Sequence, residues 1–291
     1  MSFSHDIKTK LSKINIDCEF CKIAELSGIM QFSAVNKNGR ISIITEHEAV
    51  AERILNLFSD CIGFEPEAKE YAGGYRFEFE DSSESDITIQ RLQLFQNAEL
   101  FKEELMPFDC CRISFLRGAF LGGGSISDPN KNYHLEFDAK NEMIAKELLK
   151  ELKSLNARYT TRKKHSIVYM KGYEDIATFM GMIGAGTASM EIYNVSIEKE
   201  IRNAVNRRMN CENANIDKVV KAYGKHMTAI EKIKNTIGFE GLPESLCEIA
   251  KVRMEYPDES LKELGERLSK PIGKSGVNHR LNRLIEIAES L

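Results

Sequence analysis

The chain has 291 residues, of which 42% are hydrophobic and 29% are charged, the proportions of a soluble globular protein with more than one domain. No apolar segment approaches the ~20 residues that a membrane-spanning helix requires. The first residues, MSFSHDIKTK, lack the apolar core of a signal peptide. We therefore expect a cytoplasmic protein that does not contact a membrane.

The seven cysteines are an odd number and include the adjacent pair Cys110 and Cys111, which makes a poor framework for disulfides. Cys18 and Cys21 have the CxxC spacing that is found in zinc and redox sites. The sequence has no second pair with CxxC or HxxxH spacing. Two small, half-buried thiols are therefore the favoured interpretation, and we expect neither a metal nor a cofactor.

Charge is unevenly distributed along the chain, although the net charge is only −4. Residues 1–200 contain 24 lysines and arginines against 31 aspartates and glutamates, a balance of −7. Residues 201–283 contain 16 against 11, a balance of +5, and the segment 270–283 has four basic residues and no acidic one. This pattern favours DNA binding by the C-terminal third, and it leaves open a protein partner for the acidic body.

The first 195 residues contain an internal duplication with a spacing of about 90 residues. Three pairs of positions carry it: Leu26 and Leu116, Gly28 and Gly118, and Ser33 and Gly123. A strand, an amphipathic helix, a second strand and a closing helix then follow in the same order in both copies. The expected segments are 40–45, 46–58, 75–79 and Asp86 onward, then 133–138, 140–152, 166–170 and Asp175 onward. We therefore expect a pseudo-symmetric α+β body with halves at 1–105 and 106–195.

The segment FLRGAFLGGGSIS (115–127) resembles the LAGLIDADG helix of homing endonucleases. The duplication places such a helix in each half, and small side chains would let the two helices approach closely at the seam between the halves. The small residues are Gly28, Gly118, Ala119, Gly122, Gly123 and Gly124. A phosphate-binding loop is disfavoured for the glycine run because no Lys-Ser or Lys-Thr pair follows it.

The resemblance also implies where catalytic acids would stand. In active members the last acidic residue of each motif binds a divalent metal, and the matching positions here are Ser33 and Gly123. The earlier acidic positions are occupied by Gln31 and Leu121. Asp128 is a stray carboxylate that more often opens a turn such as DPNKN. We therefore expect no catalytic residues, no metal site at the seam, and a protein that is not an enzyme.

Residues 196–240 are expected to form a basic helical linker. Apolar residues from Ile201 to Ile230 follow a helical period, and Arg202, Arg207 and Arg208 form a cluster with neighbouring asparagines. Contact with the DNA backbone and docking between domains remain equally plausible roles for this cluster. Gly238, Gly241 and Pro243 then end the helix.

Residues 241–291 are expected to form a three-helix domain with a helix-turn-helix. The helices are predicted at 243–256, at 260–268 with a capping box from Ser260 to Glu263, and from Ser275, the predicted N-cap, onward. Gly265 would fit the crossing of the last two helices, although the connection 269–274 is longer than the usual 3–4-residue turn.

The polar and basic start of the last helix is typical of a helix that reads the major groove. The predicted DNA-binding residues are Lys270, Lys274, Ser275, Gly276, Asn278, His279, Arg280, Asn282 and Arg283, together with Arg202, Arg207 and Arg208. Of these, Asn278 and His279 are the candidates for contacts with base edges.

The degenerate LAGLIDADG duplication, the segment 202–218 and the helix-turn-helix together resemble the WhiA family of sporulation and cell-division regulators. The resemblance covers essentially the whole chain. It implies a nucleoid-associated transcription factor that binds double-stranded promoter DNA without a cofactor. The main alternative, a metal-dependent LAGLIDADG endonuclease, predicts carboxylates at both motif ends. An RNA-binding maturase predicts a basic sheet, whereas the strand region of the first half is acidic at Glu78, Glu80, Asp81, Glu84 and Asp86.

Overall fold

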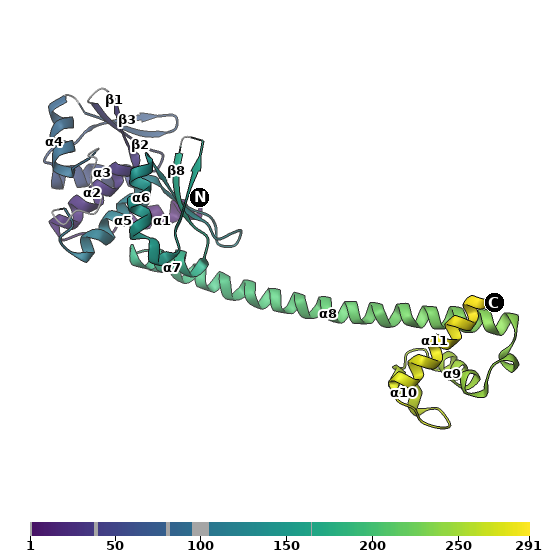
Figure 1. Ribbon diagram of the computed structural model, residues 1–291. Helices are drawn as coiled ribbons and strands as arrows, with labels where there is room; N and C mark the ends of the chain where they lie inside the picture. Colours follow the sequence, from purple (N-terminus) through teal and green to yellow (C-terminus); the bar gives the residue numbers. More distant parts are fainter. Residues whose placement is uncertain (1, 38–39, 80–81, 95–104, 164) are drawn as a thin grey trace. The chain divides into compact units, whose positions relative to one another are not determined.

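The computed structural model describes residues 2–37, 40–79, 82–94, 105–163 and 165–291 (Figure 1). The chain divides into two compact units, Met1–Glu200 and Ile201–Leu291. Within the described ranges, no helix combines the length and the apolar character that crossing a membrane would need.

The N-terminal unit begins with α1 (Phe3–Leu11) and continues with two copies of one motif. The first copy contains α2 (Glu19–Ser33), β1 (Ala34–Lys37), β2 (Arg40–Thr45), α3 (Glu48–Cys61), β3 (Glu67–Tyr71), β4 (Gly74–Glu78) and α4 (Ser82–Leu92). The second contains α5 (Asp109–Gly123), β5 (Gly124–Ile126), β6 (Leu135–Ala139), α6 (Glu142–Glu151), the short 3-10 helix η1 (Lys153–Leu155), β7 (Arg158–Arg162), β8 (His165–Met170) and α7 (Tyr173–Met182). The predicted duplication and its α+β class are confirmed.

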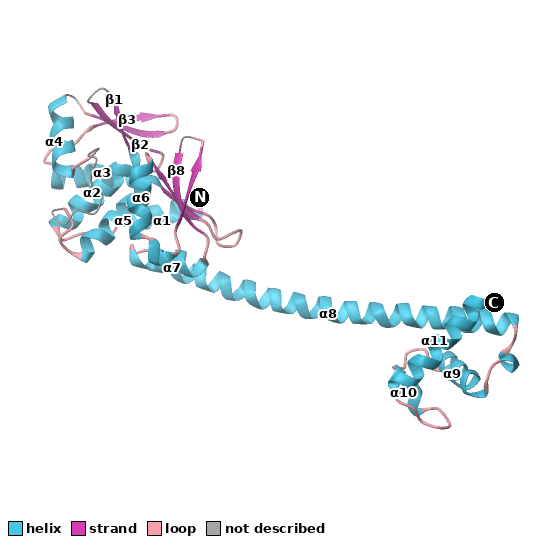
Figure 2. Ribbon diagram, in the orientation of Figure 1, coloured by secondary structure: helices cyan, strands magenta, loops and turns pink. Residues whose placement is uncertain are grey.

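Each copy forms a four-stranded antiparallel sheet, ordered β1-β2-β4-β3 in the first half and β5-β6-β8-β7 in the second (Figure 2). Residues alternate between faces as a strand requires: Leu135, Phe137 and Ala139 of β6 are buried, whereas the residues between them are not. Sequence analysis missed β3, every residue of which is exposed, because an edge strand without a buried face carries no apolar alternation.

The predicted seam is formed by α2 and α5, whose backbones touch. A Cβ atom added to Gly28 would lie 2.2 Å from the carbonyl oxygen of Phe115, and one added to Gly118 would lie 2.1 Å from that of Glu25. Only glycine fits such an approach. The run of glycines ends α5 and enters β5, so its order is helix to strand rather than the strand-to-helix order of a phosphate-binding loop.

One hydrophobic core runs through both halves. Phe32 of the first half lies 6.1 Å from Phe137 of the second, measured between ring centroids, and Phe137 lies 5.5 Å from Phe179. All three side chains are fully buried. The two halves therefore form one body and depend on each other for a closed core.

The predicted linker 196–240 is not a separate element. Residues 196–236 lie within α8 (Gly186–Thr236), a 51-residue helix that begins in the first unit and ends in the second. Its apolar side chains are exposed over much of the predicted stripe, as at Ile201 and Val205. Its first turns are buried in the core of the N-terminal unit at Ala188 and Ile192, and its last turns in the core of the C-terminal unit at Ala229, Ile230 and Ile233. Periodicity indicated the helix correctly but could not indicate which turns would be covered.

After α8, Gly238 adopts a positive φ of 67° and turns the chain, as predicted for the end of the linker. A 3-10 helix, η2 (Phe239–Gly241), follows, and then α9 (Glu244–Glu255), α10 (Leu261–Glu266) and α11 (Lys274–Ser290). The three predicted C-terminal helices are present and pack around their own hydrophobic core.

Candidate nucleic-acid interface

A helix-turn-helix is formed by α10 and α11, with α9 beneath them. Leu264 of α10 packs with Val277 and Leu281 of α11, and all three are buried. The predicted capping box begins α10: the Ser260 hydroxyl accepts from the backbone N–H of Glu263, while the Glu263 carboxylate accepts from that of Ser260 at 2.8 Å. The same interactions lower the pKa of Glu263.

The connection between α10 and α11 is long but tied to the domain. The backbone N–H of Ile272 donates to the carbonyl of Gly265 at 3.1 Å. A Cβ atom on Gly265 would lie 2.2 Å from the Ile272 carbonyl oxygen. Glycine is therefore required mainly by its close contact with the connection, whereas the sequence predicted that the helix crossing would require it. The backbone N–H of Ser269 also donates to the Glu248 carboxylate on α9, which lowers the pKa of Glu248.

The N-cap of the last helix was predicted two residues too late. Gly273, with an extended backbone, is the N-cap of α11, and the helix begins at Lys274. Ser275, predicted as the N-cap, lies inside the first turn with its side chain exposed. The chain enters the helix early because the N–H of Gly276 bonds the Gly273 carbonyl at 2.9 Å.

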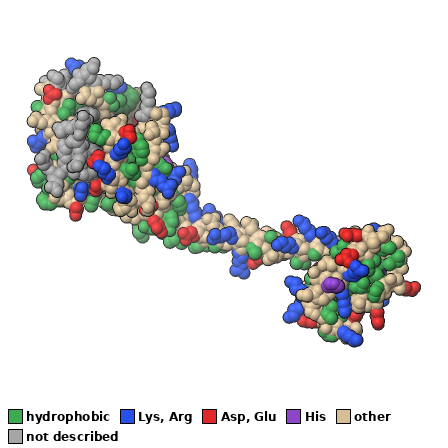
Figure 3. Space-filling model, in the orientation of Figure 1, with side chains coloured by type: hydrophobic (Ala, Val, Ile, Leu, Met, Phe, Trp, Pro, Cys, Tyr) green, Lys and Arg blue, Asp and Glu red, His purple; other side chains and the backbone are tan. Residues whose placement is uncertain are grey.

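The first turns of α11 present one exposed polar face. Ser275, His279 and Arg283 follow at four-residue intervals and are exposed, which puts them on one side of the helix. Asn278 is exposed beside them. Lys270 in the connection and Lys274 at the helix start add two exposed positive charges. Figure 3 shows lysine and arginine side chains spread over this unit.

Not every predicted contact residue is equally available. Arg280 is half-buried, and its guanidinium donates to the carbonyl of Ser245 on α9 at 3.4 Å. Arg283 pairs with Glu286 at 2.6 Å. Gly276 is half-buried, with a Cβ position 3.2 Å from the end of the Ile272 side chain. Arg280 and Gly276 therefore make contacts within the domain. Arg283 would have to break its ion pair with Glu286 before it could bind a phosphate.

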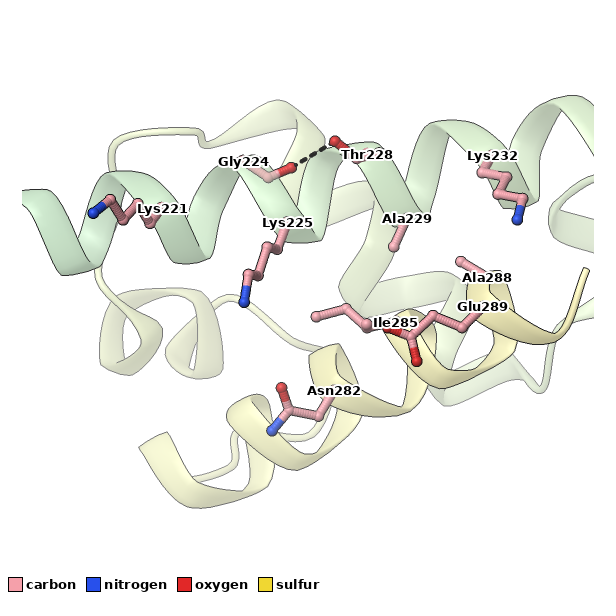
Figure 4. A pocket seen from close by; sticks show the side chains of 10 residues that line it. All are labelled: Lys221, Gly224, Lys225, Thr228, Ala229, Lys232, Asn282, Ile285, Ala288 and Glu289. Carbon is pink, nitrogen blue, oxygen red and sulfur yellow. Dashed lines mark hydrogen bonds between the residues drawn. The ribbon is translucent and has the colours of Figure 1, made fainter.

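Asn282 lies two turns after Ser275 on the same side of α11, and it also lines a hollow of about 700 Å³ between α8 and α11 (Figure 4). In Figure 4, Lys225 points from α8 toward α11. Lys221 and Lys232 line the same hollow, as does Glu289 of α11. Sequence analysis missed these lysines, although the four-residue spacing of Lys221 and Lys225 was a usable signal for a basic helix face.

The arginines of the predicted linker cluster are exposed on α8. Arg202, Arg207 and Arg208 all face solvent, and Arg208 pairs with Glu212 one turn later at 3.0 Å. This exposure suits contact with phosphates and also suits a solvated helix face.

At the seam, the motif ends hold no carboxylate. The buried Ser33 hydroxyl donates to the carbonyl of Ile29 in its own helix at 2.7 Å. On the other side, the amine of Lys8 donates to the carbonyl of Leu121 at 3.1 Å. Asp128, the stray carboxylate, accepts from the backbone and side chain of Asn130, and these bonds lower its pKa. Asp128 therefore opens a turn, as predicted.

A buried ion network also crosses the seam. Glu25 of α2 is fully buried and accepts from Arg53 at 2.8 Å and from Arg117 of α5 at 2.6 Å. Arg117 also donates to the Ser114 hydroxyl at 3.1 Å. Both oxygens of Glu25 are thus paired, whereas Nη2 of Arg53 is buried without a hydrogen-bond partner among the described residues, and the Glu25–Arg117 pair links the two halves.

Two family models match the chain. Residues 112–202 match the WhiA LAGLIDADG-like domain, and residues 205–288 match the WhiA C-terminal HTH domain. The chain belongs to the WhiA family. The family resemblance inferred from sequence is thereby confirmed, and so is the combination of a LAGLIDADG-like body with a helical HTH region.

WhiA relatives match over the full length. The chain is 39% identical to the "Probable cell division protein WhiA" of Desulfitobacterium hafniense strain Y51, covering 100% of this chain and 96% of the relative. It is 40% identical to the protein of the same name from Ruminiclostridium cellulolyticum, covering 100% and 98%. The crystal structure of full-length DUF199/WhiA from Thermatoga maritima matches with a TM-score of 0.60 at 28% identity, over 100% and 99% of the two chains.

Proposed function

We propose that this protein is a sequence-specific regulator of transcription that binds double-stranded promoter DNA through α11. The observation that carries the proposal is the exposed face of Ser275, His279 and Arg283, with Lys270 and Lys274 beside it, in a domain that matches the HTH model of WhiA. Base edges would meet the first turns of α11, and the lysines would neutralise phosphates. The name of its relatives supports a role in cell division, and the same family implies sporulation where spores are made.

We further propose that the body does not cut DNA. Hydrolysis in this fold needs carboxylates that hold a divalent cation at the motif ends, where this chain has Ser33 and Gly123. The nearby amine of Lys8 is a donor to a backbone carbonyl and offers no ligand that Mg²⁺ prefers. The body would instead enlarge the DNA-binding surface or hold a protein partner.

Specificity requires more surface than one helix offers. A good bidentate contact with a base discriminates by about 1–3 kcal/mol, whereas specific binding exceeds nonspecific binding by about 4–10 kcal/mol. The exposed arginines of α8 and the lysines beside Asn282 are the candidates for the additional contacts.

The first experiment compares full-length protein with the compact unit 201–291. The fragment must retain the end of α8, because Ala229, Ile230 and Ile233 belong to its core. Targets come from genome-wide mapping of binding sites, and both proteins are titrated on target and scrambled duplexes at equal salt. We expect a much larger specific-to-nonspecific ratio for the full-length protein. Equal ratios would mean that the body does not read DNA, and failure of the full-length protein to prefer target DNA would refute the regulator.

The second experiment tests cleavage. Supercoiled plasmid is incubated with purified full-length protein and Mg²⁺ or Mn²⁺, with Asp128→Asn as the matched variant. We expect no nicking by either protein. Metal-dependent nicking that disappears in Asp128→Asn would establish the endonuclease alternative.

A further inference from the structure

Four cysteines meet where α2 and α5 begin. The Sγ atoms of Cys18, Cys21, Cys110 and Cys111 all lie within 4.8 Å of one another. Cys18 is the N-cap of α2 and Cys21 lies in its first turn, while Cys110 and Cys111 lie in the first turn of α5. The thiols of Cys110 and Cys111 therefore lie beside the CxxC pair, although the spacing of the cysteines in the sequence did not indicate it.

The duplication explains half of this cluster. Cys21 and Cys111 are 90 residues apart and occupy matching positions in the two helices, with their Sγ atoms 3.7 Å apart. Cys18 and Cys110 do not match each other, because their counterparts are Phe108 and Phe20. The rings of Phe20 and Phe108 meet edge to face with centroids 6.2 Å apart. Two thiols and two phenyl rings therefore occupy matching places around the symmetric pair.

The sulfur spacing fits coordination to a metal. Zinc–sulfur bonds of about 2.3 Å in a tetrahedron separate the sulfur atoms by about 3.8 Å. The 3.7 Å between Cys21 and Cys111 agrees with that spacing and far exceeds the about 2.05 Å of a disulfide bond. Cys21 and Cys111 are buried, Cys18 is half-buried and Cys110 is exposed, so the cluster has a fixed inner side and an open outer side.

The surroundings favour a thiolate-rich centre. Four thiolates around a zinc ion carry a net charge of −2, and the positive ends of two helices lie beside them.

We propose that Cys18, Cys21, Cys110 and Cys111 bind one zinc ion, which fastens together the starts of the two motif helices. Binding displaces the four thiol protons into solvent and leaves the oxidation state of every atom unchanged. No ligand position is left for water or substrate, so the site is structural. It lies at the opposite end of α2 and α5 from Ser33 and Gly123, and it is therefore distinct from the metal position of the endonucleases.

Elemental analysis of the full-length protein tests the proposal. The protein is produced with zinc in the medium, purified under reducing conditions, and challenged with a chelator. We expect one zinc ion per chain, and a loss of about tenfold or more of the retained zinc in Cys18→Ser and Cys110→Ser. These two side chains are not buried, so the fold should persist, as circular dichroism would verify. The exposed Cys211 on α8 provides the matched control, since Cys211→Ser should keep its zinc.

Cobalt substitution gives a second readout that does not depend on stability. Cobalt(II) bound by four thiolates in a tetrahedron absorbs strongly in the visible range, and this absorption should be present in the parent and in Cys211→Ser but changed in Cys110→Ser. Three results would overturn the proposal: no zinc above background, equal zinc in all variants, or a protein mass lower by two hydrogens per disulfide. Visible absorption from an iron–sulfur cluster in the purified protein would overturn it as well.

Discussion

In the N-terminal unit, the charged groups nearest the helix seam pair with one another, whereas in the C-terminal unit most charged groups of the helix-turn-helix face solvent. Glu25, Arg53 and Arg117 are linked by ion pairs, while Lys270 and Lys274 are exposed. Charged side chains therefore serve stability in one unit and are accessible to a ligand in the other. Removing a charge from the seam should lower the unfolding free energy, whereas removing one from the helix-turn-helix should weaken DNA binding.

The largest expected effect concerns Glu25. Glu25→Ala leaves the buried Arg117 and the half-buried Arg53 without their carboxylate, and breaking a buried pair typically costs about 3–5 kcal/mol of unfolding free energy. Asp60→Asn is the control, because Asp60 pairs with Lys22 at the surface and such pairs contribute about 0–1 kcal/mol. Denaturant unfolding of the three proteins measures both values. Similar losses in the two variants would show that burial of the network is not what stabilises the seam.

The second effect is a pH dependence from Lys8. Burial lowers the pKa of Lys8 from 10.5 to about 8. Between about pH 8 and about pH 10.5 the unfolded chain therefore holds a proton that the native protein has released, and stability rises with pH by up to about 3 kcal/mol. Lys8→Met removes this contribution.

The measurement for Lys8 is the difference in unfolding free energy between the parent and Lys8→Met, followed from about pH 7.5 to about pH 10. Burial also raises the pKa of Tyr75 and Tyr133, but those groups titrate in both proteins and cancel in the difference. A difference that does not change with pH would mean that the Lys8 amine is solvated.

The third effect lies in the C-terminal unit and concerns DNA binding. Replacing Lys270 or Lys274 with Ala should reduce the slope of log affinity against log salt by about 0.9 each, which is about 1 kcal/mol of binding at 0.15 M salt. Arg283→Ala should reduce it less, because Arg283 already pairs with Glu286. Lys146→Ala, on α6 and paired with Glu142, serves as the control. Unchanged salt slopes in the two lysine variants would mean that Lys270 and Lys274 do not contact phosphates and that this part of the domain serves only in packing.

The smallest expected effect concerns helix capping, which Ser260 provides for α10 and Ser275 does not provide for α11. Ser260→Ala removes the cap of α10 and should lower the unfolding free energy of the C-terminal unit by about 1 kcal/mol. Ser275→Ala removes no cap and should change it by less than about 0.5 kcal/mol, while weakening DNA binding. Thermal unfolding of the unit 201–291 compares the two variants. A larger loss from Ser275→Ala would restore Ser275 as the capping residue.

Sequence patterns predicted the elements that bury one face. The strand at 40–45, the seam glycines and the capping box at Ser260 were all visible because burial, close approach and capping each impose a local residue choice. The edge strand β3 was invisible for the converse reason, since its exposed residues are free to vary in type. The acidic positions Glu80 and Asp81 lie outside the described residues.

Features created by tertiary contact escaped the sequence. Cys110 and Cys111 are not a metal motif by spacing, and they join Cys18 and Cys21 in one cluster only where α5 begins beside α2. The 90-residue repeat could have signalled this, because it aligns Cys21 with Cys111. Asn282 was predicted at the DNA face from its polarity, and only the packing of α8 shows that it also lines a hollow.

The backbone contact between α2 and α5 limits how this protein can change over generations. Gly28, Gly118 and Gly122 each face a backbone carbonyl of the opposite helix, and every residue type has that carbonyl. No compensating substitution on the partner helix can therefore make room for a larger residue at Gly28 or Gly118. In a saturation mutagenesis library these two sites should tolerate nothing beyond glycine in any background, whereas the motif ends at Ser33 and Gly123 remain freer to diverge because side chains form part of their surroundings.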